Sequence, residues 1–189
     1  MLVAARVREH ATYEDLLEVP DNMVAELIEG ELYASPRPGF PHADAASELV
    51  SFLRTAFGRR GNGDWHIVFE PQIRFGQNVL VPDIAGWRVD RVPVMPRVAT
   101  IGIAPDWVCE VLSYSTARID RQKKLPIYAS AQVSHAWIVD VDLQNLEVKR
   151  LENGGWRDVA TFGGDAIVRA EPFDAIEIQL SFIWGPLPA

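Results

Sequence analysis

WVCEVL, residues 107–112, is an almost continuous apolar run that a single carboxylate interrupts. Such a short run predicts a central strand that is buried on both faces of a sheet. Because side chains alternate along a strand, Val108, Glu110 and Leu112 are expected to share one face. A carboxylate between apolar neighbours is costly to bury unless it is paired or binds a metal ion, so Glu110 is the best single candidate for a metal ligand. A structural glutamate, bonded to an arginine or to backbone amides, is the alternative.

Asp83 is the second candidate ligand, and it follows a proline inside a strand expected over residues 79–89. Pro82 cannot donate a hydrogen bond to a neighbouring strand, so pairing is weaker there and the next side chain can be exposed. Taken alone, Asp83 is equally consistent with a turn or an edge strand. Two carboxylates on apolar strands separated by one loop favour a shared site for a divalent ion, which can activate water for phosphodiester hydrolysis.

A helix expected from Ser115 to about residue 131 carries the third candidate. Asp120, Lys124 and Tyr128 are spaced by four residues and therefore share one helix face. An Asp–Lys pair at this spacing is more often a solvated surface pair, but a tyrosine at the same phase argues against full exposure. Lys123 points about 100° away and is expected on the surface or against a phosphate. Lys124 is therefore the lysine that we expect at the site.

The rest of the chain alternates between strand and helix patterns. Apolar residues recur at helical spacing over residues 42–57, and Asn153-Gly154-Gly155 is typical of a hairpin turn. Pro126 predicts a kink in its helix or the end of a first segment. We expect an α/β fold, a mixed sheet flanked by helices with additional β-hairpins. Strands are expected at 67–75, 79–89, 107–112, 136–140 and 176–180, hairpins at 22–34 and 146–162, and a short helix capped by Thr12 at 13–17.

The composition predicts a single globular domain over residues 1–189. Hydrophobic residues make up 48% of the chain and charged residues 23%, and the formal net charge is −8. This acidity argues against a broad attraction to nucleic acid, so any such binding requires a local basic patch. The single cysteine, Cys109, excludes an intramolecular disulfide. No apolar stretch is long enough for a signal peptide or a membrane span, so we expect a cytoplasmic protein without membrane contact.

Four short motifs follow one another in a defined order: Pro82-Asp83, then Glu110-Val111-Leu112-Ser113, then Asp120 with Lys124 and Tyr128, then Ala136-Trp137-Ile138-Val139-Asp140. Their order and spacing resemble the Uma2 family, described as putative restriction endonucleases, which is itself similar to the PD-(D/E)xK nuclease superfamily. The resemblance covers roughly residues 13–162. It implies a restriction-endonuclease-like core, with Asp83 and Glu110 as ligands of Mg²⁺ or Mn²⁺ and Lys124 as the catalytic lysine. The implied substrate is DNA, with RNA as the other option.

One departure from the superfamily pattern concerns this lysine. The superfamily usually has a lysine two residues after the acidic residue of the strand, and that position is Leu112 here. A leucine cannot stabilise a developing negative charge. Lys124 replaces the missing group if the helix brings its amine to the carboxylates. If it does not, the nuclease interpretation lacks a charge-stabilising residue.

Further side chains are weaker candidates for completing the site. His42 and Glu48 lie near the start of the first long helix, and surface glutamates are common on such helices. Glu70 and Gln72 are expected to share a strand face, with one of them lining the cleft. Which of Glu48, Glu70 and Gln72 completes a metal site is left open by the sequence.

The remaining basic residues divide into structural and phosphate-contacting candidates. His66 and His135 are expected to be structural or exposed. The chain has no zinc-ligand spacing, glycine-rich phosphate loop or Gly-x-Ser-x-Gly elbow. Several arginines flank the proposed site in sequence and are either phosphate contacts or solvated loop residues: Arg88, Arg91, Arg97, Arg118 and Arg121.

These residues predict metal-dependent hydrolysis of nucleic-acid phosphodiester bonds. Two other interpretations are a catalytically inactive nucleic-acid-binding or structural domain on the same fold, and a phosphoesterase that acts on a small nucleotide. We also expect a homodimer, because nucleases that cut both strands commonly use two copies and the hairpin strands offer edges for pairing.

Overall fold

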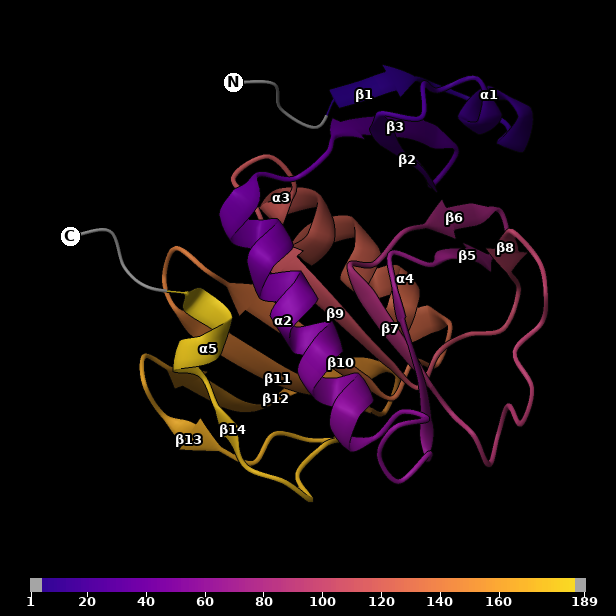
Figure 1. Cartoon of the computed structure of the whole chain (residues 1–189). Coiled ribbons are helices and arrows are strands. Elements are labelled where there is room, and N and C mark those ends of the chain that lie inside the picture. The colour runs from indigo at the N-terminus through magenta and orange to yellow at the C-terminus, as the bar shows by residue number, and fades with distance from the viewer. Residues whose placement is uncertain (1–4, 186–189) are drawn as a thin grey trace.

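Two six-stranded sheets organise residues 5–185, the part of the chain that the computed structural model describes (Figure 1). The central sheet contains, in spatial order, β12 (Gly155–Gly163), β11 (Asn145–Glu152), β10 (His135–Asp140), β9 (Trp107–Leu112), β7 (Ile84–Arg88) and β4 (Trp65–Phe69). The second sheet contains β1 (Ala5–Arg8), β3 (Glu31–Pro36), β2 (Met23–Ile28), β6 (Asn78–Leu80), β5 (Gln72–Phe75) and β8 (Thr100–Ile101).

β9 is the buried centre of the central sheet, as its sequence predicts. All six of its residues are buried, and it pairs in parallel with β10 and antiparallel with β7. Trp107, Cys109 and Val111 contribute to one hydrophobic cluster, whereas Val108 and Leu112 contribute to a second cluster on the other face. The period-two assignment of the strand is therefore confirmed, and Glu110 lies on the face of Val108 and Leu112.

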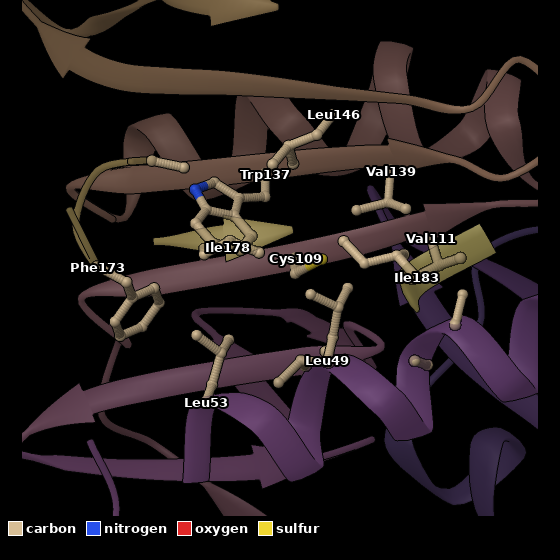
Figure 2. Packing of buried hydrophobic residues seen from close by; sticks show 14 of the residues in the cluster. Leu49, Leu53, Cys109, Val111, Trp137, Val139, Leu146, Phe173, Ile178 and Ile183 are labelled. Carbon is tan, nitrogen blue, oxygen red and sulfur yellow. The ribbon is translucent and has the colours of Figure 1, made fainter. Parts of the chain in front are cut away.

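The long helix α2 (Phe40–Ala56) covers the first face of the central sheet (Figure 1). Leu49 and Leu53 are fully buried against the cluster that includes Cys109, Val111 and Trp137 (Figure 2). The indole rings of Trp107 and Trp137 meet edge to face with centroids 5.2 Å apart, a preferred geometry for aromatic pairs. The helical spacing of residues 42–57 thus predicts this element correctly, and its apolar side holds it against the sheet.

Two strands that the sequence predicts as continuous are each divided between the two sheets. The predicted strand 67–75 becomes β4 and β5, and the predicted strand 79–89 becomes β6 and β7. Pro71 and Pro82 stand at the two breaks, where they cannot donate to a ladder. The breaks lie side by side, because the Glu70 amide donates to the Asp83 carbonyl at 2.9 Å. Asp83 therefore lies in the gap between the sheets and not within a strand.

The helix expected over residues 115–131 consists of three consecutive segments. α3 (Ala117–Ile119) leads into a π-helical turn, η1 (Asp120–Lys124), and then into α4 (Leu125–Ser130). Pro126 has no amide hydrogen for the ordinary i→i−4 bond, and the Leu125 amide bonds instead to the carbonyl of Asp120. The irregularity that Pro126 predicts is confirmed, and it takes the form of a π turn.

Both predicted hairpins are present, and each has a two-residue turn. Glu29-Gly30 joins β2 to β3, and Asn153-Gly154 joins β11 to β12, with positive φ at all four residues, as type I′ turns require. Thr12 caps α1 (Tyr13–Leu17) through a capping box. The predicted strand 176–180 is shorter and pairs outside the two large sheets. The remaining elements are β13 (Ile167–Val168), β14 (Ile178–Gln179) and α5 (Ser181–Trp184).

The described helices include none that is both long enough and apolar enough to cross a membrane.

Buried carboxylates and a buried lysine interrupt the core between the two sheets. Four charged residues are at most 8% exposed: Glu26, Glu110, Asp120 and Lys124. The junction of the sheets is therefore the place to look for a functional site.

Gly86, in the middle of β7, is a position where the packing around β9 can be tested. A Cβ atom at Gly86 would lie 3.1 Å from the Trp65 ring and 3.2 Å from the Trp107 ring. We expect Gly86→Ala to lower the free energy of unfolding by about 1–3 kcal/mol, the usual cost of overpacking a core. Urea unfolding measures the change. Gly102→Ala is the matched control, since no atom lies within 4 Å of its added Cβ. An unchanged stability of Gly86→Ala would contradict the close packing of Gly86 against Trp65 and Trp107.

Candidate active site

An open cavity of about 300 Å³ lies at the junction of the two sheets. Asp83 reaches it from the break before β7, Glu110 from β9 and Lys124 from η1. The three residues that the sequence predicts as a site thus line one cavity. Their convergence, expected from the order strand, loop, strand and helix, is confirmed by the structure.

Lys124 lies at the centre of a buried ionic cluster. Its Nζ atom is 3.0 Å from a carboxylate oxygen of Glu26, 3.0 Å from Glu110 and 3.3 Å from Asp120. The same amine donates to the carbonyl of Val81 at 3.3 Å. Burial alone would lower the pKa of Lys124, but the charges of Glu110 and Glu26 outweigh burial and raise it well above the ordinary value. Lys124 is therefore a cation held among three carboxylates.

Glu110 is satisfied by two donors from the helical segment. The Tyr128 hydroxyl donates to its Oε1 at 2.6 Å, and Lys124 donates to its Oε2 at 3.0 Å. Burial raises the pKa of Glu110 well above its usual value, while the ammonium of Lys124 opposes that shift. The i, i+4, i+8 spacing accordingly places Lys124 and Tyr128 against Glu110, and Asp120 against Lys124, across the π turn.

Asp83 is held at the edge of the cavity by the backbone of β9 and by α2. The Val111 amide donates to Asp83 Oδ2 at 2.7 Å, and His42 Nε2 lies 3.2 Å from Asp83 Oδ1. Burial alone would lower the pKa of His42, but the hydrogen bond to Asp83 and the charge of that carboxylate raise it. His42 Nδ1 is buried without a hydrogen-bond partner among the described residues. His42 is thus a positioning residue for Asp83.

Glu26 is a member of the site that the sequence analysis did not single out. It lies in β2, its Oε1 accepts a hydrogen bond from the Val81 amide at 2.8 Å, and it contacts Lys124. A usable signal was present, since MVAELI at residues 23–28 is an apolar strand interrupted by one carboxylate, the same pattern as WVCEVL. The strand pattern alone could not show that two such strands from different sheets share one lysine.

The three open candidates for completing the site have different positions. Glu70 lines the cavity, where it pairs with Arg37 at 2.6 Å. Gln72 is not in the cavity lining, because its side chain accepts hydrogen bonds from Tyr13 and Thr100. Glu48 is exposed on α2 and is not in the lining either. Of the three, only Glu70 is available to the site.

The arginines expected near the site lie elsewhere, and none of the five lines the cavity. Arg91 pairs with Asp106, and Arg121 forms a two-bond contact with Glu147. Their proximity in sequence did not translate into proximity in space, since Arg88 stands at the far end of β7 from Asp83. Arg37, from the loop before α2, is the arginine that lines the cavity.

The structure places the remaining basic residues outside the site. Lys123 pairs with Glu29 at 2.8 Å, away from the cavity, as its helical phase predicts. His66 bonds to the carbonyl of Val92 at 3.0 Å, and His135 lies 3.5 Å from Glu171. Both histidines have structural contacts, which agrees with the expectation from sequence.

Carboxylate oxygens are the ligands that Mg²⁺ and Mn²⁺ prefer, and five carboxylates of the described residues line this cavity: Glu26, Glu70, Asp83, Glu110 and Asp120. Among residues 5–185, however, no group of three or more acidic, histidine or cysteine side chains is arranged to hold one ion. A magnesium ion commonly uses only one or two carboxylates and completes its shell with water and substrate phosphate. The donor chemistry therefore fits such an ion through Asp83 and Glu110.

Comparisons with known proteins identify a family and a fold. Residues 11–182 match the Uma2 family, described as a putative restriction endonuclease. A crystal structure of a putative nuclease belonging to DUF820 from Anabaena variabilis ATCC 29413 is similar, with 24% sequence identity, a TM-score of 0.76, and coverage of 92% of this chain and 97% of that chain. A search of curated protein sequences gives no match.

Sheet topology and structural likeness together define a restriction-endonuclease-like fold with its candidate active site at the sheet junction. The match over residues 11–182 identifies the family as well: the chain belongs to Uma2. The order of the Asp83, Glu110 and Lys124 motifs led us to expect this family and this fold, and both expectations are confirmed.

The ionic cluster predicts a specific pH dependence of stability. Burial raises the pKa of Asp120 from 3.8 to about 6, so the folded state holds its proton over a range where the unfolded state has lost it, and stability falls as pH rises through that range. Relative to Asp120→Asn, the wild-type free energy of unfolding should fall by about 2 kcal/mol between about pH 4 and pH 7.

Urea unfolding of wild type, Asp120→Asn and Asp142→Asn at several pH values measures this difference. Asp142 is exposed, so its substitution should leave the wild-type pH profile unchanged. Parallel profiles for wild type and Asp120→Asn would show that Asp120 is not protonated on folding.

Proposed function

We propose that the cavity catalyses hydrolysis of phosphodiester bonds in nucleic acid, with DNA as the substrate and Mg²⁺ or Mn²⁺ as the cofactor. The observation that carries the proposal is the placement of the Lys124 ammonium beside Glu110 and in one cavity with Asp83. Membership of the Uma2 family supports a nuclease function in general. A phosphodiester needs both a site for a divalent ion and a positive charge near its non-bridging oxygens, and this cavity has residues for both.

In this proposal Asp83 and Glu110 hold the ion, which when bound lowers the pKa of a water molecule and neutralises phosphate charge. Lys124 stabilises the negative charge that develops on the phosphate. Its ammonium stays protonated because the surrounding carboxylates raise its pKa. Glu26 and Asp120 orient that ammonium, and the Tyr128 hydroxyl orients Glu110. His42 and the Val111 amide orient Asp83.

The position of Lys124 on a helix replaces the lysine that the superfamily pattern would put at Leu112. Leu112 belongs to the apolar cluster on the same side of β9 as Glu110. The amine of Lys124, carried by η1, therefore reaches Glu110 without a lysine in the strand. Lys123 cannot act as a substitute, since it pairs with Glu29 outside the cavity.

Three site variants and one control variant should separate metal binding from turnover. Asp83→Asn and Glu110→Gln should abolish Mn²⁺-dependent cleavage of supercoiled plasmid, because each removes a ligand of the ion. Lys124→Met should retain metal binding but lose about 10²–10³-fold in turnover, the usual cost of removing one charge stabiliser. Lys123→Met is the matched control and should cleave almost as well as wild type.

Thermal unfolding with and without Mn²⁺ provides a second readout that needs no activity. Wild type and Lys124→Met should be stabilised by the ion, whereas Asp83→Asn and Glu110→Gln should not. An inactive Lys123→Met beside an active Lys124→Met would show that the catalytic lysine is wrongly assigned. The same plasmid, a single-stranded DNA and a nucleotide ester, assayed together, separate an endonuclease from a small-molecule phosphoesterase.

A second candidate function is nucleic-acid binding without cleavage. It is favoured by the engagement of both Glu110 oxygens in contacts with Lys124 and Tyr128, and by the absence of a three-ligand group among residues 5–185. In such a domain the carboxylates serve only to neutralise Lys124. Wild-type protein that binds DNA, cleaves none and gains no stability from Mn²⁺ would establish this function.

We also propose that the protein acts as a homodimer, since cutting both strands of a duplex requires two sites. β12 is an edge strand of the central sheet and is nine residues long, and a long edge strand can pair with a second copy. Sedimentation at micromolar concentration should give a dimer. A monomer at high micromolar concentration would contradict the proposal.

A further inference from the structure

A second hollow lies along the flank of α2, beside the edge strand β4. It has a volume of about 480 Å³, and its lining includes Arg54, Arg59, Arg60 and Phe69 together with the hydroxyl-bearing residues Ser47 and Ser51. We call these six residues the α2 groove. No acidic residue from the described part of the chain lines it. Phe69 is 42% exposed although it is a large aromatic side chain.

Within the described range, the three arginines of the α2 groove have no internal partners. Among residues 5–185, the guanidinium groups of Arg54, Arg59 and Arg60 make no ion pair or hydrogen bond, and all three residues are exposed. Most other arginines in this part of the chain pair with a carboxylate: Arg8, Arg37, Arg88, Arg91, Arg121, Arg150, Arg157 and Arg169.

The chain has a net charge of −8, so carboxylates outnumber cations, yet no carboxylate of the described residues pairs with these three arginines. Guanidinium groups gathered in one groove repel each other, and an anionic partner relieves that repulsion. Arginine binds phosphate through two parallel hydrogen bonds. The Ser51 hydroxyl can donate to a phosphate oxygen as well, whereas the Ser47 hydroxyl donates to the Ala43 carbonyl at 2.7 Å. The chemistry of the α2 groove therefore suits a chain of phosphates.

The α2 groove and the active-site cavity are neighbours on the same elements. Phe69 lines the groove, and the next residue, Glu70, lines the cavity. α2 begins at the cavity, where His42 contacts Asp83, and continues to the groove. From His42 to Arg54 the helix advances by about 18 Å, which equals about five base pairs of duplex at 3.4 Å each.

We propose that the α2 groove binds the sugar–phosphate backbone of DNA about five base pairs from the bond that the cavity cleaves. This inference rests on the proposed nuclease function for the identity of the ligand, but it concerns different residues. Backbone contacts carry no sequence information, so the groove supplies affinity and orientation and not recognition of particular bases. It is also the local basic patch that an acidic nucleic-acid-binding protein requires.

The test measures binding of a fluorescent mixed-sequence DNA duplex by anisotropy, with EDTA present so that no cleavage occurs. The triple variant Arg54→Ala/Arg59→Ala/Arg60→Ala should bind about 10–100-fold more weakly at ~0.1 M salt. The slope of log affinity against log salt should fall by about 2–3, since each lost phosphate contact removes about 0.9. The loss should be the same for unrelated duplex sequences. Arg97→Ala is the matched control, because Arg97 is exposed and lines neither hollow.

Two outcomes would overturn the inference: an unchanged affinity and salt slope in the triple variant, or an arginine-dependent affinity for polyglutamate but none for duplex. Failure of the proposed hydrolysis is distinguishable from both. If wild type cleaves nothing but binds duplex through the three arginines, the proposed DNA contact at the α2 groove stands and the proposed nuclease activity fails. If the triple variant cleaves plasmid and binds duplex as well as wild type does, the proposed nuclease activity stands and the proposed DNA contact fails. Unchanged thermal unfolding of the triple variant shows that it is folded.

Discussion

The neutralisation of one buried ammonium group connects the parts of this fold. Lys124 Nζ lies within 3.3 Å of Glu26, Glu110 and Asp120. Those carboxylates come from β2 of the second sheet, from β9 of the central sheet and from η1 itself. Each charge loses several kcal/mol of hydration on burial and regains it only in good mutual geometry. The two sheets and the helical segment are therefore compatible with burial of the lysine only in the arrangement that assembles the cavity.

The same junction depends on two interruptions of hydrogen bonding. Pro71 and Pro82 end the pairing of two long extended segments, and each segment then continues in the other sheet. A regular strand through Asp83 would direct its side chain to a sheet face. The break directs it instead to the Val111 amide and to His42 at the edge of the cavity. The Asp83 carboxylate is thus exposed to the cavity by a local defect in an otherwise regular sheet.

Sequence patterns predicted those features that depend on local periodicity. The alternation in WVCEVL placed Glu110 on the correct face, and the four-residue spacing placed Lys124 and Tyr128 beside it, because neighbours along one element have a fixed geometry. The hairpin at Asn153-Gly154 followed from its requirement for positive φ.

Features that depend on partners far apart in the chain were not predictable in this way. Glu26 and Glu110 share Lys124 although they are 84 residues apart in the sequence, and no periodicity reports such a contact. The two sheet-to-sheet crossings had a local signal in Pro71 and Pro82, but the apolar pattern on both sides outweighed it in the prediction. The expectation that the flanking arginines lie at the site was wrong, because closeness in sequence does not imply closeness in space. Arg88, for example, is near Asp83 in sequence but lies at the far end of β7.

The division of charge explains how an acidic chain of this kind can engage nucleic acid. Carboxylates are concentrated around one lysine in the interior, whereas the three arginines of the α2 groove lie at the surface. α2 links both, because its first turn supports Asp83 through His42 and its last turns present Arg54 to the groove. Leu49 and Leu53 hold the helix against the central sheet between these points (Figure 2). The separation between the proposed backbone contact and the cavity is consequently set by α2, whose apolar side is packed on the central sheet.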